Sequence, residues 1–413
     1  MRLPTESSVA IWKRSVEAQA TPPRRAGWRA RATLAAAGLA AAVLIGEGGL
    51  RAIGPRLPAV YSLATIATFQ TYHPIYGFFH RPGATGWIVT PEFTSYVRIN
   101  SRGLRDRDLE VPKPPGTYRV LMLGDSLVEG AQVPLENTVA KRLEVELQAT
   151  NGSKIEVVNA GNAGFGTGQE LLFLEHDGPT YEPDLVVLVF FVDNDLADNG
   201  FAVSRERKLD TTRRPFFVPD GRGGLELRPF SAPPPDPFGG LRSGLRQVSL
   251  LYNVAENLVL TREARDHENQ QIGKNRPTYQ VESPPEWQEA WQVTELLIAR
   301  MRDTAREMGI QLVLVVAPSS SQVSEQAWRV LVSGDSQARA ARYDPEAPNR
   351  RLAVIAERTG VKLLDLLPPI RAAAAEGARP YFPDDGHWTN QGHAVGAREI
   401  TAYLRSGGLI PVR

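Results

Sequence analysis

The residues Leu185-Val-Val-Leu-Val-Phe-Phe191 form an uninterrupted apolar run. A strand of a parallel sheet has this pattern because helices cover both of its faces. Other short apolar segments are interpreted in the same way: Arg119–Leu123, Ile155–Asn159, Gln311–Ala317 and Val361–Leu366. Strands and helices therefore alternate along the chain, which predicts a sheet of about five parallel strands with helices on both faces.

The segments between these strands carry apolar residues at helical spacing. Val139, Leu143 and Leu147, for example, recur every four residues. Helices are predicted over 136–149, 169–176, 287–308, 350–358 and 390–405. In such a sheet, ligands bind beyond the carboxyl ends of the strands, so the residues that follow each strand are the candidates for a site.

The strand–helix alternation covers 116–199 and 285–408, and the other regions differ in composition. Residues 200–284 contain Pro233-Pro234-Pro235, several glycines and many charges, and are interpreted as an irregular insertion with one helix near 250–260. Residues 55–115 hold aromatic residues, glycines and prolines without helical periodicity. This pattern predicts a β-rich flap followed by a linker.

The N-terminal region predicts a membrane anchor. Residues 1–31 are basic and polar, and the apolar run 32–50 follows them. We interpret 32–50 as an uncleaved signal anchor with 1–31 in the cytoplasm, because basic residues stay on the cytoplasmic side. A cleaved signal peptide and an alanine-rich amphipathic or buried helix are the alternatives.

The overall composition excludes several classes of protein. The 413 residues are 42% apolar and 23% charged, as in an ordinary globular protein, and the net charge of +1 gives no reason to expect nucleic acid as a partner. The absence of cysteine excludes a thiol nucleophile, disulfides and a cysteine zinc site. No group of His, Asp and Glu has metal-ligand spacing, so we expect no metal site.

Four short segments that each come after a predicted strand carry the chemistry. They are Leu123-Gly-Asp-Ser126, Asn159-Ala-Gly-Asn-Ala-Gly164, Asn194-Asp195 and Asp384-x-x-His387. Ser126 supplies a hydroxyl nucleophile, while Gly164 and Asn194 supply N–H donors for an oxyanion. A second Gly-Asp-Ser, at 334–336, follows a predicted helix end and is interpreted as a surface turn.

His387 is the candidate base, and a carboxylate near it would orient its ring. Asp384 is favoured for this role because two intervening residues leave a natural turn, and Asp385 is the competing partner. His393 is predicted to be structural. Together the segments predict acyl transfer through a serine ester.

At these residues the chain resembles the SGNH (GDSL) hydrolase family. The resemblance implies a flavodoxin-like three-layer α/β/α domain, ester hydrolysis or acyl transfer without a cofactor, and functional roles for Ser126, Gly164, Asn194 and His387, with Asp384 completing a triad. Val192 departs from the pattern, since the family usually has Gly two residues before the Asn. The segment Asn100-Ser-Arg-Gly-Leu-Arg105 resembles membrane-anchored bacterial members, so we expect a single-pass inner-membrane protein with a periplasmic catalytic domain.

Three functions are compatible with this pattern. The first is an esterase that removes an O-acetyl or other small acyl group, with an acylated carbohydrate as the expected substrate. Trp388 motivates the carbohydrate because an indole can stack on a sugar ring, although the same side chain could simply pack against the last helix. The second is an O-acyltransferase that modifies an extracytoplasmic polysaccharide, and the third is a non-catalytic glycan-binding protein on the same fold.

Overall fold

The computed structural model describes residues 27–53, 69–151, 154–207, 211–234, 236–256, 258–259, 275–333 and 342–411. The chain divides into two compact units, Met1–Pro55 and Arg56–Arg413. Each unit is described by itself.

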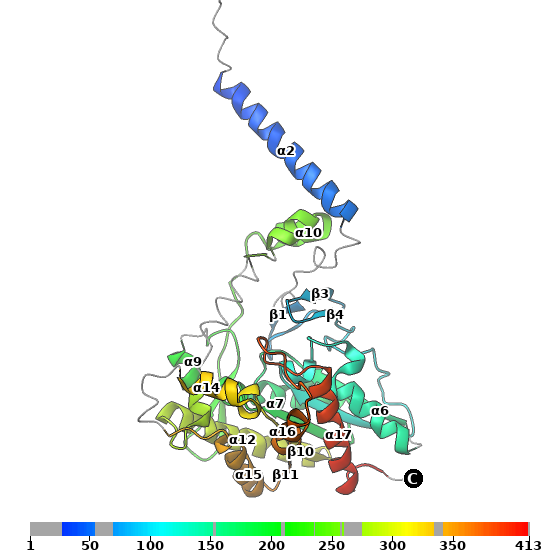
Figure 1. Cartoon of the computed structure of the whole chain (residues 1–413), viewed down its shortest axis with the longest axis vertical. Coiled ribbons are helices and arrows are strands. Elements are labelled where there is room, and N and C mark those ends of the chain that lie inside the picture. The colour runs from blue at the N-terminus through cyan, green and yellow to red at the C-terminus, as the bar shows by residue number, and fades with distance from the viewer. Residues whose placement is uncertain are drawn as a thin grey trace, which may run out of the picture. The chain divides into compact units, whose positions relative to one another are not determined.

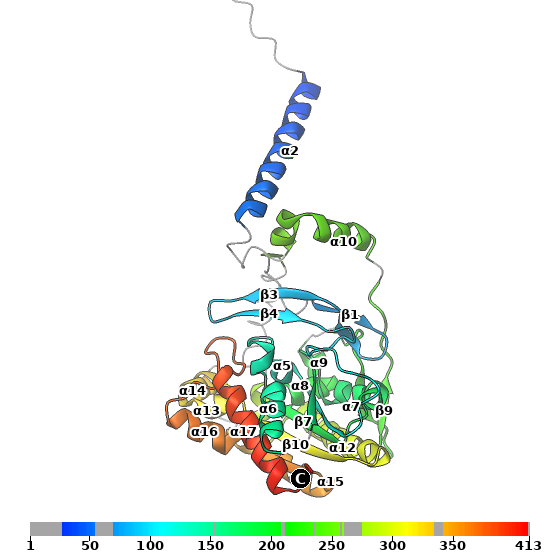
Figure 2. The ribbon, with the colours of Figure 1, turned by 90° about the vertical axis from the view of Figure 1, so that its right-hand side faces the viewer.

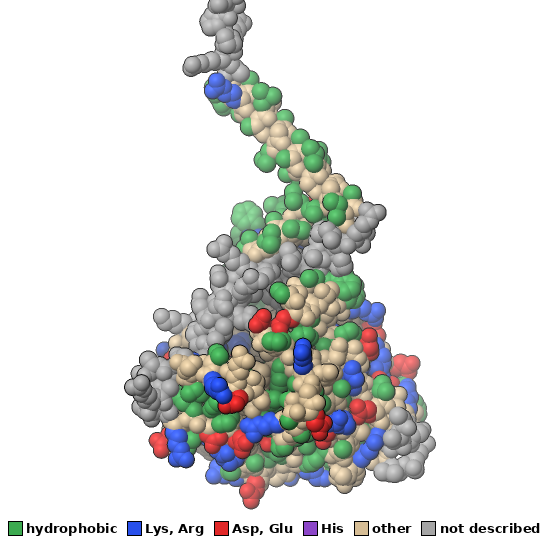
Figure 3. Space-filling view, in the orientation of Figure 1, with side chains coloured by type: hydrophobic (Ala, Val, Ile, Leu, Met, Phe, Trp, Pro, Cys, Tyr) green, Lys and Arg blue, Asp and Glu red, His purple; other side chains and the backbone are tan. Residues whose placement is uncertain are grey.

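The first unit contains one long apolar helix, α2 (Trp28–Ile53). Its 26 residues span about 39 Å at 1.5 Å per residue, more than the roughly 30 Å of a bilayer core. Hydrophobic side chains cover its length and a basic cluster lies at its N-terminal end (Figure 3). Within the described residues, α2 is the one helix long and apolar enough to cross a membrane. It continues past the predicted end at residue 50, where Arg51 pairs with Glu47 one turn earlier at 2.8 Å.

The second unit is built on one parallel sheet. Its strands are β5 (Thr117–Gly124), β6 (Lys154–Gly161), β7 (Leu185–Phe191), β10 (Gln311–Ala317) and β11 (Lys362–Asp365), in the order β11-β10-β7-β5-β6. Numbered along the chain this order is 2-1-3-4-5, the flavodoxin-like arrangement, whose ligand site lies where the first and third strands meet. The predicted fold class is confirmed.

Helices cover both faces of the sheet (Figure 1). One face packs against α6 (Val139–Asn151), α16 (Leu367–Ala375) and α17 (Asn390–Ser406), and the other against α7 (Thr167–His176), α12 (Pro285–Glu307) and α15 (Ala347–Thr359). Alternate residues of each strand enter opposite cores: Leu121 and Leu123 face α7 and α12, whereas Val120 and Met122 face α6 and α17. Shorter helices complete the domain: α5 (Ser126–Glu129), η2 (Leu135–Asn137), η3 (Gly178–Tyr181), α8 (Asp195–Asn199), α13 (Ser320–Val323) and α14 (Glu325–Ser333).

Two antiparallel hairpins form the flap that the sequence predicts. The first pairs β1 (Gln70–His73) with β2 (Gly77–His80), and the second pairs β3 (Thr85–Val89) with β4 (Thr94–Arg98). The second hairpin lies beyond one end of the sheet, next to α5 (Figure 2). A small apolar core joins the flap to the segment that follows α5. It consists of Phe69, Ile88, Val97, Ile99 and Ala131.

The segment Asn100–Asp106 connects this flap to the sheet. The Asn100 side-chain oxygen accepts the N–H groups of Arg102 and Leu104, both at 2.9 Å, which holds the turn closed. The buried Arg105 guanidinium donates to the carbonyl oxygens of residues 129, 130 and 133, at the end of α5 and just beyond it. The Asp106 carboxylate accepts the Asn159 N–H of β6 at 2.8 Å. The motif that resembles membrane-anchored family members is therefore a structural brace.

The insertion contains several short regular elements. They are α9 (Phe201–Glu206), β8 (Phe216–Pro219), β9 (Leu225–Arg228), α10 (Gly239–Val248) and η4 (Arg276–Tyr279). The helix expected near 250–260 is present over 250–256.

Candidate active site

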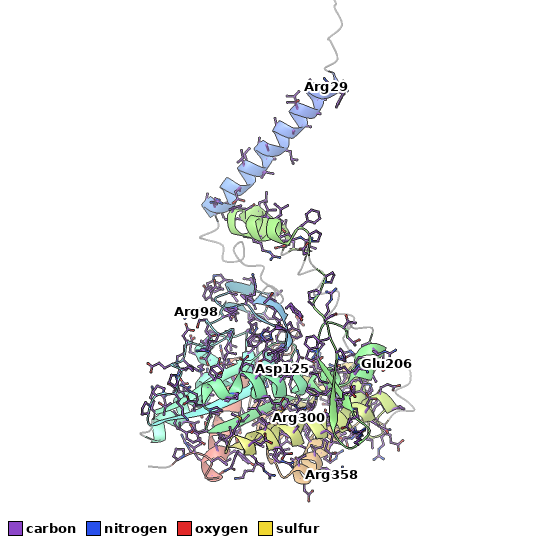
Figure 4. All side chains as sticks on the ribbon, turned by 180° about the vertical axis from the view of Figure 1, so that it is seen from behind. Arg29, Arg98, Asp125, Glu206, Arg300 and Arg358 are labelled. Atoms are coloured by element: carbon purple, nitrogen blue, oxygen red, sulfur yellow. The ribbon has the colours of Figure 1, made fainter. Side chains whose placement is uncertain are left out.

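The nucleophile candidate lies where β5 turns into α5. Asp125 caps α5 by accepting the Leu127 N–H at 2.9 Å, and Ser126 is the first helical residue. The turn is tight: a Cβ on Gly124 would lie 2.4 Å from the Val128 side chain. Asp125 lies at the end of the sheet nearest the flap strand that carries Arg98 (Figure 4). The N–H of Ser126 has no acceptor within its own helix, so it is available to a ligand.

Ser126 meets His387 across 261 residues of sequence. The Nε2 atom of His387 lies 2.8 Å from Oγ of Ser126, and its Nδ1 atom lies 2.8 Å from Oδ1 of Asp385. A hydroxyl paired with an imidazole that a carboxylate orients is the arrangement used for nucleophilic catalysis.

The partner of His387 is Asp385, and the preference for Asp384 was wrong. Gly386 adopts a φ of +79°, which reverses the chain tightly. The Asp385 carboxylate then lies against both the His387 ring and the His387 N–H, the latter at 3.3 Å, as in an Asx turn. Asp384 is exposed, and its backbone N–H donates to Glu92.

Neighbouring carboxylates set the protonation of the pair. Burial alone would lower the pKa of His387, but Asp385, and with it Asp125 and Asp193, raises this pKa to about 9. Burial likewise opposes ionisation of Asp385, yet the adjacent His387 holds the Asp385 pKa below its usual value. Both shifts favour the charged forms of the pair, an imidazolium next to a carboxylate.

Gly164 lies on the loop after β6, as the sequence predicts, with a φ of +82°. Its N–H makes no hydrogen bond to another residue in the described part of the chain. The preceding N–H, that of Ala163, donates to Glu129 of α5 at 2.7 Å, which ties this loop to the helix that Ser126 begins. The ring of Phe78 closes over Gly164, 3.4 Å from where a Cβ would be.

Asn194 follows β7 and occupies the position just before α8, without a capping hydrogen bond from its side chain. Its amide nitrogen donates to Asp198 at 2.9 Å, and the same side chain lies near enough to Asp125 to lower the pKa of that carboxyl. Burial has the larger effect and raises the Asp125 pKa to about 6. Val192, the departure from the family pattern, is fully buried, and its N–H extends the sheet by donating to Ala317 at 3.0 Å.

A group of buried carboxyls lies around Asp125. Burial raises the pKa values of Glu170 and Asp195 well above the usual range, and neighbouring carboxylates raise them further. Asp195 also accepts the Phe191 N–H at 2.7 Å, which fixes the turn after β7. Among the described residues, no group of three or more His, Asp or Glu could hold a metal ion.

Trp388 belongs to the hydrophobic core, so its tentative role in stacking on a sugar was wrong. The side chain is 0% exposed and meets the buried His393 edge to face at 5.6 Å. A Cβ on Gly396 would approach the Trp388 ring to 2.9 Å, which shows how closely α17 packs on it. His393 is structural, as predicted: its Nδ1 accepts the Val139 N–H at 3.1 Å.

The second Gly-Asp-Ser, at 334–336, lies outside the described residues. The helix expected before it is α14, which ends at Ser333.

Sequence reasoning missed the flap residues that contact the site. The Glu92 carboxylate accepts the N–H groups of Asp384 and Asp385, at 3.0 and 2.7 Å. The His80 ring lies 3.3 Å from Glu129, and both side chains are fully buried. These contacts join residues that are far apart along the chain, so no local pattern could have revealed them.

The sheet has the flavodoxin-like order, and Ser126, His387 and Asp385 meet beyond its carboxyl edge, so the chain has an SGNH/GDSL hydrolase-like fold. Residues 278–410 match the family described as the SGNH hydrolase-like domain of the acetyltransferase AlgX. The matched region includes Asp385 and His387, whereas Ser126 lies outside it.

Several solved structures are similar to the chain at low identity. A catalytic mutant of Axe2, an acetylxylan esterase from Geobacillus stearothermophilus, is 16% identical with a TM-score of 0.37, covering 72% of this chain and 96% of its own. A two-domain esterase active on acetylated mannans is 13% identical with a TM-score of 0.38, covering 72% and 51%. A G-D-S-L family lipolytic protein from Veillonella parvula is 11% identical with a TM-score of 0.35, covering 70% and 98%. No curated protein matches the chain.

Proposed function

We propose that the protein is a serine esterase that hydrolyses an acyl ester through Ser126, His387 and Asp385. The observation that carries this proposal is the pair of 2.8 Å contacts that link the serine hydroxyl, the imidazole and the carboxylate. The third function considered, a non-catalytic binding protein, would have no need for this geometry.

The proposed reaction follows from the positions of these groups. Neutral His387 accepts the Ser126 proton as Oγ attacks the ester carbonyl, and Asp385 stabilises the imidazolium that forms. The N–H groups of Ser126 and Gly164 and the amide of Asn194 hold the oxyanion in our proposal. His387 then returns the proton to the leaving alcohol, and water attacks the acyl-enzyme with His387 again acting as the base.

An O-acyltransferase is the second candidate. The match of residues 278–410 to a domain described for an acetyltransferase favours it and also favours acetyl as the acyl group. The chemistry differs only in the last step, where a hydroxyl of an acceptor replaces water.

We propose further that the substrate is an acylated glycan outside the cytoplasm and that α2 anchors the protein in the inner membrane. The length and apolar surface of α2 support the anchor. Trp388 gives no support to the glycan, since it is buried. The sugar is therefore tested directly.

The test uses full-length protein in detergent with acetylated oligosaccharides, aryl acetates and an added unmodified oligosaccharide. Free acetate that exceeds transferred acetyl supports the esterase, and the reverse supports the transferase. If neither product forms and an active-serine probe fails to label Ser126, the proposed catalytic function is wrong.

A further inference from the structure

Two loops that carry the proposed chemistry are held from outside the hydrolase domain. The acid loop (residues 382–387) bears Asp385 and His387, and the oxyanion loop (residues 161–164) bears Gly164. Both loops contact the flap, each through a different hairpin. The flap thus touches the two loops whose positions decide the geometry at Ser126.

The tip of the β3–β4 hairpin holds the acid loop. Glu92 receives two backbone N–H groups of the acid loop, one on each carboxylate oxygen, at 3.0 Å from Asp384 and 2.7 Å from Asp385. Next to it, the ring of Phe93 packs on Phe382 at 5.1 Å. A bidentate, charged acceptor of this kind fixes both the position and the tilt of the turn.

The backbone that carries Glu92 is itself held by its hairpin. The Thr90 hydroxyl accepts the N–H groups of Glu92 and Phe93 at 3.2 and 3.1 Å, and the Thr90 N–H donates to the Phe93 carbonyl at 2.9 Å. The turn that presents Glu92 is therefore closed independently of the acid loop. Glu92 can act as a fixed support.

The β1–β2 hairpin holds the oxyanion loop. The Gln70 amide donates to the Asn162 side chain at 3.1 Å and to the Ala163 carbonyl at 2.8 Å. His80 lies 3.2 Å from the Asn162 amide and 3.3 Å from Glu129, which accepts the Ala163 N–H. The backbone immediately before Gly164 is therefore braced from the flap.

We propose that the flap is a positioning element of the active site, in which Glu92 holds the acid loop and Gln70 holds the oxyanion loop. The inference rests on the proposed function, because it assigns these residues a role in that reaction. Neither residue touches the reacting atoms. They act through Asp385 and through Gly164.

The two contacts have separable consequences. Loosening the acid loop weakens the pairing of Asp385 with His387, so the apparent pKa in the pH profile of kcat/KM falls. Loosening the oxyanion loop lowers kcat at every pH, because it affects transition-state stabilisation and leaves the base unchanged. Small misplacements of catalytic groups can cost up to about 100-fold in rate, so we expect each single variant to lose about tenfold.

The experiment compares Glu92→Ala, Glu92→Gln and Gln70→Ala in full-length protein, with p-nitrophenyl acetate as the substrate. Thr94→Ala and Thr71→Ala are the matched controls, since both residues are exposed on the same hairpins. We expect Glu92→Ala to shift the rising limb of the pH profile of kcat/KM to lower pH by at least half a unit. Glu92→Gln keeps one acceptor and should shift this limb less. Gln70→Ala should lower kcat without any shift, and the controls should match the wild type.

Thermal unfolding of each variant and labelling by a fluorophosphonate separate the possible failures. If the wild type is labelled at Ser126, but Glu92→Ala and Gln70→Ala both show the wild-type kcat and the wild-type pH profile of kcat/KM, the flap inference alone is overturned. Equal losses of activity in variants and controls, in step with lowered unfolding temperatures, would also overturn it. A wild type that does not label at Ser126 would overturn the proposed function and the inference with it.

Discussion

Oδ1 of Asp385 lies 2.8 Å from Nδ1 of His387, while the neighbouring Asp384 is exposed to solvent. We predict that Asp385→Asn lowers kcat on an aryl acetate by about 10³–10⁴-fold, because the amide favours the wrong tautomer of the imidazole. Asp384→Asn keeps the backbone N–H that Glu92 accepts and should change kcat by less than about twofold. Steady-state rates of both variants, measured side by side, check the assignment, and a larger loss in Asp384→Asn would reverse it.

The choice between these two aspartates shows where sequence reasoning ends. Strand patterns place Ser126, Gly164 and Asn194 after β5, β6 and β7, where the structure has them, whereas the helix α16 separates β11 from the loop that carries His387. The identity of the acid depends on how Gly386 turns the chain, and on Glu92, which lies 292 residues before the loop it holds. The Asp385-Gly386 pair marks a turn but does not show which aspartate faces the ring, and the distant contact leaves no local signal.

The pH dependence of the reaction provides a second prediction. The nucleophile needs neutral His387, and the carboxylates around this ring, Asp385 foremost, raise its pKa to about 9 against the effect of burial. We expect kcat/KM to rise about tenfold per pH unit from neutrality and to level off near pH 9. The residual activity of Asp385→Asn should level off at lower pH, since the variant loses that neighbouring charge. A wild-type profile that is flat from pH 6 to 9 would contradict this assignment of charge.

Covalent labelling tests the nucleophile independently of any substrate. Ser126 has a partner in His387, so a fluorophosphonate should label the protein at Ser126 and Ser126→Ala should abolish labelling. Ser336→Ala is the matched control, because it alters the same Gly-Asp-Ser letters at the other copy and should label normally. Labelling that persists in Ser126→Ala would remove this serine from the site.

Trp388 shows a different limit of sequence reasoning. A tryptophan beside a proposed catalytic histidine fits a sugar platform and a packing residue equally well in sequence. The decision comes from tertiary packing, since close contact with Gly392 and Gly396 of α17 places the ring in the core. Trp287 and Trp291, by contrast, lie four residues apart on the buried stripe of one long helix, a spacing that helical periodicity assigns to the core.

Asn194 tests the proposed oxyanion site. Its amide is oriented by Asp198, and we predict that Asn194→Ala lowers kcat by about 10²–10³-fold, the usual cost of one oxyanion donor. The KM should change little if the contact forms only in the transition state. Asp198→Asn is informative beside it, since it keeps a side-chain oxygen that can accept the amide N–H and should cost far less. Unchanged kcat in Asn194→Ala would show that the Asn194 side chain plays no part in the reaction.

His393 provides a prediction about stability. Burial, and then nearby positive charges of which Arg105 is the largest, lower its pKa to about 3 from 6.5, so the folded protein keeps this ring neutral in acid. Its contribution to stability is complete above pH 6.5 and is lost as the pH falls toward 3, because only the unfolded chain takes up the proton. This one group should remove about 1.4 kcal/mol of unfolding free energy per pH unit within that window. His393→Asn, which can still accept the Val139 N–H, should be less stable at neutral pH but lose stability less steeply in acid. Urea unfolding of both proteins between pH 4 and 6.5, followed by tryptophan fluorescence, measures the two slopes, and equal slopes would show that His393 does not carry the acid sensitivity.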